Sequence, residues 1–310
     1  MNIKSSGIQI EIADTHPDGG RIEGGGARPV VLLIMGLGMQ LIAWPPELVS
    51  GLVAAGYRVV RFDNRDVGLS EKFSRLGTPN LMWEGLKFRF GLNIRPPYSL
   101  SDMAADSLGV LDALGIAEAH VAGVSMGGMI AQRLAALAPG RVASLTSIMS
   151  SSGARGLPGP QPQVTRALLT RPRDKSVEAA VENTARLLKI IGSPAFPTAD
   201  AELRENVAAA AARNFNPPGV VRQMVAIAAD GTRAAALAKI TAPTLVIHGS
   251  ADPLLPFACG EDTARRIPGA TLEAIPGMGH DLPPPVVKRV LPLLLSHFSA
   301  ARPDPKTENL

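Results

Sequence analysis

The pentapeptide G-x-S-x-G at residues 123–127 constrains the fold of this chain more than any other feature. An apolar run leads into it and a helix-like run over residues 129–138 follows at once, so the pattern predicts a strand, a tight turn and a helix. The two glycines lack the Cβ atoms that would collide as the chain turns back, and Ser125 would be strained with its hydroxyl exposed. The alternative is a glycine-rich turn whose serine only caps the helix.

Strand-like and helix-like segments alternate along most of the chain. An opening antiparallel hairpin is predicted from residue 3 to about residue 22, with its turn at residues 17–20. The run at residues 29–35 is continuously apolar, which is typical of a strand buried on both faces of a parallel sheet. Further strands are predicted at residues 57–63, 143–149, 242–249 and 270–276, and helices at residues 99–114 and 285–299. This alternation predicts an α/β fold with a mostly parallel sheet and helices on both faces.

The alternation of predicted strands and helices stops near residue 150. Residues 153–162 are rich in turn formers, and residues 164–229 contain alanine-rich helical stretches without strand-like alternation. The chain is therefore divided into a first core segment (1–152), an all-helical segment (153–231), a second core segment (232–300) and a polar, disordered tail (301–310). With 310 residues, of which 46% are hydrophobic, the chain is long enough to bury a large core.

Composition limits the partners and the location. The net charge is +4, but Lys and Arg are scattered and aromatic residues make up only 4%, so a nucleic-acid partner is not expected. Cys259 is the single cysteine, which excludes an intrachain disulfide and a thiolate metal site. No apolar run has the length of a signal-peptide core or a membrane span, which predicts a cytoplasmic protein without a membrane partner. A homodimer remains open.

A serine hydroxyl is a weak nucleophile at neutral pH and needs a base that an acid holds in the right tautomer. In open α/β sheets such sites lie outside the carboxyl ends of the strands. His280 meets this condition, because it lies in a loop directly after a predicted strand and before the final helix. The other histidines lie in the hairpin, before the serine strand, inside a strand end or in the last helix: His16, His120, His248 and His297.

Asp252 is the predicted acid, because it lies in the loop that follows the strand at residues 242–249. Its alternative role is an Asx turn ahead of Pro253, and the two roles are compatible. Asp281 and Asp230 are weaker candidates for the acid. The order along the chain is then Ser, Asp, His, which differs from the order in the chymotrypsin and subtilisin families.

Two backbone N–H groups are predicted to bind the oxyanion of an attacked carbonyl group. One belongs to Met126, directly after the serine, and the other to Leu37 in the loop at residues 36–38, whose alternative role is a plain glycine-rich turn. The chemistry is complete with these groups, so no metal or organic cofactor is expected. Residues predicted to bind substrate are Gly36, Gly38, Met39, Leu254 and Met278, although methionine at such positions is more often part of the core.

Together these motifs resemble the α/β-hydrolase superfamily from residue 8 to about residue 299, and within it the aclacinomycin methylesterase group at residues 34–38, 62–66 and 275–280. The resemblance implies a mostly parallel eight-stranded sheet, a helical cap formed by residues 153–231, and hydrolysis of carboxylic esters through an acyl-enzyme. One departure is that Met35-Gly36 stands where many relatives carry His-Gly, so a side chain able to brace the oxyanion loop is missing.

The predicted function is a serine hydrolase that cleaves small carboxylic esters, either methyl esters or esters of short to medium acyl chains. Two alternatives use the same three side chains: a cofactor-free perhydrolase or haloperoxidase, and a lactonase or C–C bond hydrolase. A dehalogenase or epoxide hydrolase is disfavoured, because those relatives carry Asp in place of Ser125. The alternative outside enzymology is a catalytically silent ligand-binding protein on the same scaffold.

Overall fold

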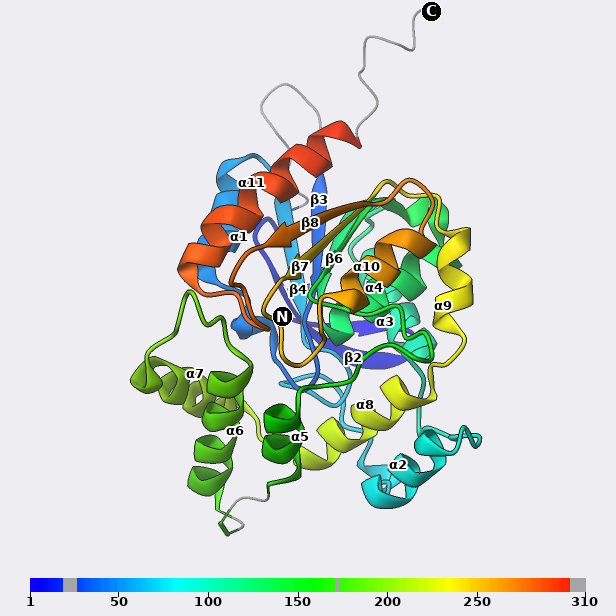
Figure 1. The fold of residues 1–310 in the computed structure, drawn as a ribbon. Coiled ribbons are helices and arrows are strands. Elements are labelled where there is room, and N and C mark those ends of the chain that lie inside the picture. The colour runs from blue at the N-terminus through cyan, green and yellow to red at the C-terminus, as the bar shows by residue number, and fades with distance from the viewer. Residues whose placement is uncertain (19–26, 171–172, 175, 302–310) are drawn as a thin grey trace, which may run out of the picture.

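The computed structural model describes residues 1–18, 27–170, 173–174 and 176–301, and its centre is one eight-stranded sheet (Figure 1). The strands follow the order β1-β2-β4-β3-β5-β6-β7-β8; β1 pairs antiparallel with β2 and β2 with β4, and every other pairing is parallel. The predicted mostly parallel eight-stranded sheet is thereby confirmed. The strands are β1 (Asn2–Ser5), β2 (Ile8–Asp14), β3 (Val30–Ile34), β4 (Arg58–Phe62), β5 (Ala119–Val124), β6 (Val142–Ile148), β7 (Thr244–Gly249) and β8 (Thr271–Ile275).

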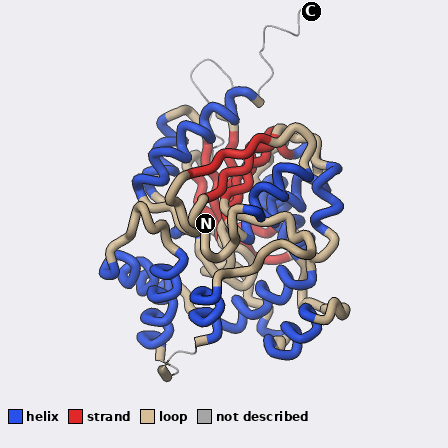
Figure 2. Tube along the Cα trace, viewed as in Figure 1, coloured by secondary structure: helices blue, strands red, loops and turns tan. Residues whose placement is uncertain are grey.

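Helices cover both faces of the sheet, as Figure 2 shows with helices in blue and strands in red. The helices α1 (Pro46–Ala54) and α11 (Pro284–Ala300) pack together on one face. The other face carries α3 (Leu100–Ala113), α4 (Met126–Leu137), α9 (Arg233–Ala236) and α10 (Ala258–Arg266). Two hydrophobic clusters, one on each face, form the core. The prediction of helices on both faces is therefore also confirmed.

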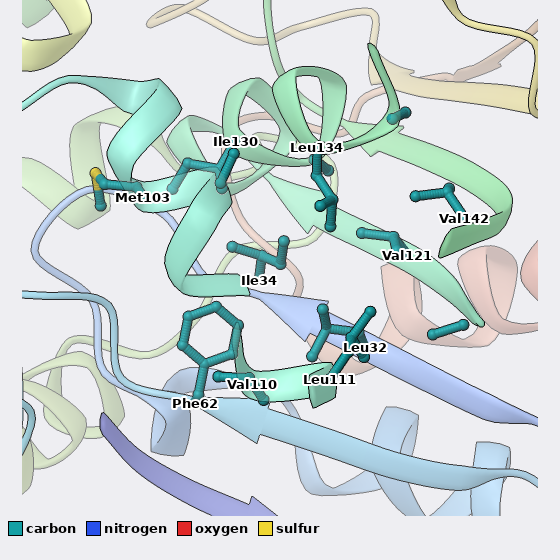
Figure 3. Close-up of a cluster of buried hydrophobic side chains, with 14 of the residues drawn as sticks. Leu32, Ile34, Phe62, Met103, Val110, Leu111, Val121, Ile130, Leu134 and Val142 are labelled. Carbon is teal, nitrogen blue, oxygen red and sulfur yellow. The ribbon is translucent and has the colours of Figure 1, made fainter. Parts of the chain in front are cut away.

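Strand β3 explains why an unbroken apolar run is needed at the centre of such a sheet. Its side chains alternate between the two clusters: Leu32 and Ile34 belong to one, and Val31 and Leu33 to the other. All four are fully buried, because helices cover both faces. Figure 3 shows Leu32 and Ile34 among the side chains of α3 and α4, with Phe62 of β4 beside them.

Among its described residues, the segment between β6 and β7 contains four helices of eight or more residues and no strand. We call residues 162–229 the helical insertion; it lies below the sheet in Figure 1. Its helices are α5 (Pro162–Leu169), α6 (Val177–Ile191), α7 (Asp200–Arg213) and α8 (Pro217–Ala229), and α2 (Leu81–Arg89) contacts α8 from the side. None of the helices in the described part of the chain combines the length and the apolar character that a membrane crossing requires.

The opening hairpin forms, but the predicted turn is wrong. Ser6 and Gly7 make the turn between β1 and β2, with φ values of 49° and 85°. A two-residue hairpin turn with both central φ angles positive matches the right-handed twist of its strands. Pro17 and Asp18 follow β2 in a turn outside the sheet, while Gly19 and Gly20 lie outside the described residues, as does the tail from residue 302.

Candidate active site

Ser125 occupies the single residue between β5 and α4. Its backbone has φ 53° and ψ −120°, a conformation that costs a residue other than glycine conformational energy. The turn is held because the Ser125 N–H donates to the Ile148 carbonyl at 2.9 Å, and the Ser150 hydroxyl donates to the Ser125 carbonyl at 2.7 Å. The predicted strand, tight turn and helix are therefore present around a strained serine.

The glycines of the pentapeptide allow the turn to pack. A Cβ atom on Gly123 would lie 2.2 Å from the carbonyl oxygen of Gly127, and one on Gly127 would lie 2.0 Å from the carbonyl oxygen of Ile34. Both distances are far below van der Waals contact, and the opposing atoms are backbone, which cannot rotate away. Glycine is thus required at both positions so that α4 can approach β5 and β3.

The substitution Gly127→Ala is expected to lower the free energy of unfolding by about 3 kcal/mol or more, because the new methyl group must displace strand β3. Urea unfolding followed by circular dichroism measures the change. Gly140→Ala is the matched control, since nothing lies within 4 Å of a Cβ atom there. It should change the stability by about 0.5 kcal/mol or less. Equal stability of the two variants would contradict the steric account of the turn.

His280 and Asp252 lie beside Ser125 at the carboxyl ends of the parallel strands. His280 Nε2 lies 3.0 Å from Ser125 Oγ, and His280 Nδ1 lies 2.7 Å from Asp252 Oδ2. The three residues follow β5, β7 and β8, whose parallel carboxyl ends share an edge. Because a carboxylate only accepts hydrogen bonds, the imidazole proton lies on Nδ1 and Nε2 is free to accept the serine proton. The arrangement can remove a proton from the hydroxyl.

Asp252 combines the two roles considered for it. Its Oδ1 accepts the N–H groups of Leu254 and Leu255, both at 2.9 Å, while Oδ2 faces His280. The turn therefore fixes the carboxylate that holds the imidazole. The weaker candidates for the acid bind elsewhere: Asp281 accepts hydrogen bonds from Ser193, and Asp230 pairs with Arg133 and Arg233.

His248 lies close to Asp252 but does not face Ser125. Its Nε2 donates to the Leu255 carbonyl at 2.8 Å and lies 3.6 Å from Asp252 Oδ2. Burial lowers the pKa of His248, so its imidazole is neutral at pH 7. A neutral ring leaves the negative charge of Asp252 available to His280. His248 also holds the loop that carries the carboxylate, through its bond to Leu255.

The loop at residues 36–38, which we call the glycine loop, lies against the serine. A Cβ atom on Gly36 would lie 3.3 Å from Ser125 Cβ and 3.9 Å from Ser125 Oγ. Among the described residues, the N–H groups of Leu37 and Met126 donate to no other group. Met126 begins α4, where first-turn N–H groups have no partner within the helix. Both N–H groups are thus available to a ligand.

Polar side chains of the loop after β4 hold the chain on both sides of the glycine loop. The Asn64 amide donates to the Met35 carbonyl at 2.9 Å, and Asp63 Oδ1 accepts the Leu41 N–H at 2.7 Å. Asn64 and Asp63 are buried. The Met35 side chain is apolar and cannot hydrogen-bond to the glycine loop. The side-chain hydrogen bonds here come instead from Asn64 and Asp63 in the loop after β4.

The helical insertion contributes four hydrogen bonds near the site that the sequence does not reveal. The Ser193 N–H donates to Asp281 Oδ1 at 2.9 Å, and Ser193 Oγ accepts the Gly279 N–H at 2.9 Å, directly beside His280. The His280 N–H donates to the Ile191 carbonyl at 2.7 Å. Gln223 of α8 accepts a hydrogen bond from the glycine loop. Neither Ser193 nor Gln223 belongs to a motif, so no pattern in the sequence marks them.

The residues predicted to bind substrate differ in burial. Met39 and Leu254 are half-buried, as is Gly38, while Gly36 is buried against Ser125. Met278 is fully buried within the hydrophobic cluster on the side of α1 and α11. Their contacts with substrate remain predictions.

In the described part of the chain, no group of three or more His, Cys, Asp or Glu side chains is arranged to hold a metal ion.

Residues 29–283 match the α/β hydrolase fold family. Rhodomycin D methylesterase DnrP of Streptomyces peucetius is 33% identical over 293 residues, which cover 87% of this chain and 91% of that protein; the predicted resemblance to methylesterases is thereby confirmed. The enol-lactonase from Burkholderia xenovorans LB400 shares the fold with a TM-score of 0.68 at 23% identity, covering 96% of this chain and 100% of that one. The meta-cleavage product hydrolase CumD from Pseudomonas fluorescens IP01 does so with a TM-score of 0.71 at 20% identity, covering 97% and 98%. By sequence and by fold, this chain belongs to the α/β hydrolase fold family.

Proposed function

We propose that the protein is a carboxylic ester hydrolase that works through a serine-bound acyl intermediate. The observation that carries the proposal is the continuous hydrogen-bonded chain from Asp252 through His280 to Ser125, with 2.7 Å and 3.0 Å between its atoms. The available N–H groups of Leu37 and Met126 support it, as does the similarity to a protein named as a methylesterase. The site uses a nucleophile, a base and an acid in the roles that acyl transfer requires.

The proposed reaction begins when Ser125 Oγ attacks the ester carbonyl and its proton passes to His280 Nε2. The carbonyl oxygen becomes an oxyanion that the N–H groups of Leu37 and Met126 bind. The ester C–O bond then breaks, and the imidazolium returns the proton to the leaving alcohol. Water attacks the acyl-serine, gives a proton to His280, and the carboxylic acid leaves as Ser125 recovers its proton. Asp252 stabilises the imidazolium in both halves of the reaction.

The test is a panel of esters given to the wild-type protein: p-nitrophenyl esters of rising chain length, and methyl esters of bulky acids. We expect acid and alcohol in equal amounts, and an initial burst of p-nitrophenol equal to the amount of enzyme where deacylation is slow. Labelling by a fluorophosphonate reports the reactive serine independently of substrate. A protein that hydrolyses none of the esters and takes up no label would refute the proposal and favour a silent binding protein.

A parallel assay with hydrogen peroxide separates ester hydrolysis from perhydrolysis. Peroxide would replace water in the second half-reaction and give a peracid in place of the acid. With the same ester concentration in both assays, we expect the enzyme to form more carboxylic acid than peracid. Dominant peracid formation would assign the same three residues to a perhydrolase.

A further inference from the structure

A buried glutamine of the helical insertion holds the glycine loop from outside the sheet. Gln223 lies on α8 and is fully buried. Its Oε1 accepts the Gly38 N–H at 2.9 Å, and its Nε2 donates to the Arg65 carbonyl at 2.9 Å. Because both ends of the amide are engaged, the side chain has one orientation and connects the glycine loop to the loop after β4.

The bond to Gln223 fixes the peptide group next to the free Leu37 N–H. The Met39 N–H donates to the Gly36 carbonyl at 3.2 Å and the Gly38 N–H donates to Gln223, while the Leu37 N–H between them has no partner among the described residues. Gly38 has φ +66°, and a Cβ atom there would lie 3.0 Å from Val220 of α8. Since the Gly38 peptide plane joins that of Leu37 through one Cα atom, fixing the first restricts the second.

The insertion also holds the chain just beyond the glycine loop. The Gln40 amide donates to the carbonyls of Ala210 and Asn214 at 2.7 Å and 3.0 Å, at the end of α7. Arg213 donates to Gln40 Oε1 at 2.7 Å and to Asp63 Oδ2 at 2.6 Å. Two helices of the insertion therefore contact this short segment, one at Gly38 and one at Gln40.

We propose that Gln223 is a positioning residue for the oxyanion site, so that α8 of the helical insertion helps to orient an oxyanion donor of the core. This inference rests on the proposed function, because it concerns the Leu37 N–H as an oxyanion donor. Gln223 acts only through Gly38 and touches no reacting atom.

The experiment compares Gln223→Met, which keeps the length of the side chain but loses both hydrogen bonds, with the wild type. Removing an oxyanion donor costs about 10²- to 10³-fold in kcat, so misplacing one should lower kcat about 10- to 100-fold with KM changed about twofold or less. Phenylboronic acid adds to the serine oxygen and places a hydroxyl in the oxyanion site, so its affinity should fall by the same factor as kcat.

Asn216→Ala is the matched control. Asn216 precedes α8 and its amide donates to the Asp66 carbonyl at 2.8 Å, a bond of the same kind between the insertion and the core that does not touch the glycine loop. It should lower the melting temperature while leaving kcat and boronate affinity unchanged. Gln223→Glu keeps an acceptor for the Gly38 N–H and should retain more of the boronate affinity than Gln223→Met. If Gln223→Met does not fold, Gln223→Asn, which is one carbon shorter, takes its place.

The outcomes separate this inference from the proposed function. If the wild type binds the boronate, Ser125→Ala does not, and Gln223→Met binds it as tightly as the wild type, the inference fails and the proposed function stands. The inference also fails if Gln223→Met and Asn216→Ala lower kcat equally. If the wild type itself does not bind the boronate, the proposed function fails and the inference falls with it.

Discussion

Replacing Ser125 by alanine is expected to lower kcat/KM for p-nitrophenyl acetate by about 10⁴- to 10⁶-fold, the loss seen when a serine nucleophile is removed. The reason is chemical, because no other hydroxyl lies within hydrogen-bond distance of His280 Nε2 among the described residues. The variant should fold normally, since within the described ranges the Ser125 hydroxyl bonds to His280 alone. Steady-state kinetics and fluorophosphonate labelling measure the loss.

The control for this variant is Ser50→Ala on the exposed face of α1, where the hydroxyl donates to the Glu47 carbonyl. It should leave kcat/KM and labelling unchanged. Turnover by Ser125→Ala that approaches the rate of the wild type would mean that another group attacks the ester, and the proposed mechanism would then be wrong.

Asp252→Asn is expected to lower kcat by about 10⁴-fold, as in the serine protease example where the tautomer of the histidine is lost. The neighbours of Asp252 in the structure determine the orientation of the side-chain amide in this variant. Its oxygen would keep the N–H groups of Leu254 and Leu255, so the NH₂ group would face His280 Nδ1. An amide donor at that position favours the proton on Nε2, where it blocks acceptance of the serine proton.

The matched control is Asp112→Asn, an exposed aspartate at the end of α3 that pairs with Arg141. It should retain the kcat of the wild type. The melting temperature of Asp252→Asn should stay near that of the wild type, because the turn at Leu254 and Leu255 is preserved. A kcat within about tenfold of the wild type, far short of the expected loss, would show that Asp252 does not control the tautomer.

The motif around Ser125 was predictable because its causes are local. Close approach of α4 to β5 and β3 demands glycine at 123 and 127, and a periodic sequence on each side identifies the strand and the helix. The start of the helix predicted at residues 99–114 is another case: the Ser99 hydroxyl accepts the Asp102 N–H, and the Asp102 carboxylate accepts the Ser99 N–H, which forms a capping box. The contact between Gly123 and Gly127 and the bonds between Ser99 and Asp102 each join residues a few positions apart.

The first hairpin shows where local reasoning selects the wrong site. Pro17 and Asp18 are strong turn formers, yet the hairpin turn lies at Ser6 and Gly7. The turn at Ser6 and Gly7 allows β2 to extend through Asp14 and pair with β4 through its last three residues. The position of the hairpin turn therefore depends on the pairing of β2 with β4, a strand about fifty residues away. The turn propensities of the residues do not reveal this pairing.

The amino-acid sequence by itself determined the class of the sheet, the strained serine turn and the order of the three side chains after their strands, since sterics and periodicity act over a few residues. Only the tertiary structure decided that Gln223 reaches Gly38, 185 positions away, and that Ser193 holds the loop of His280. Such contacts depend on how the insertion packs against the core. That packing arises from many weak apolar contacts across the whole chain, and no short stretch of sequence encodes it.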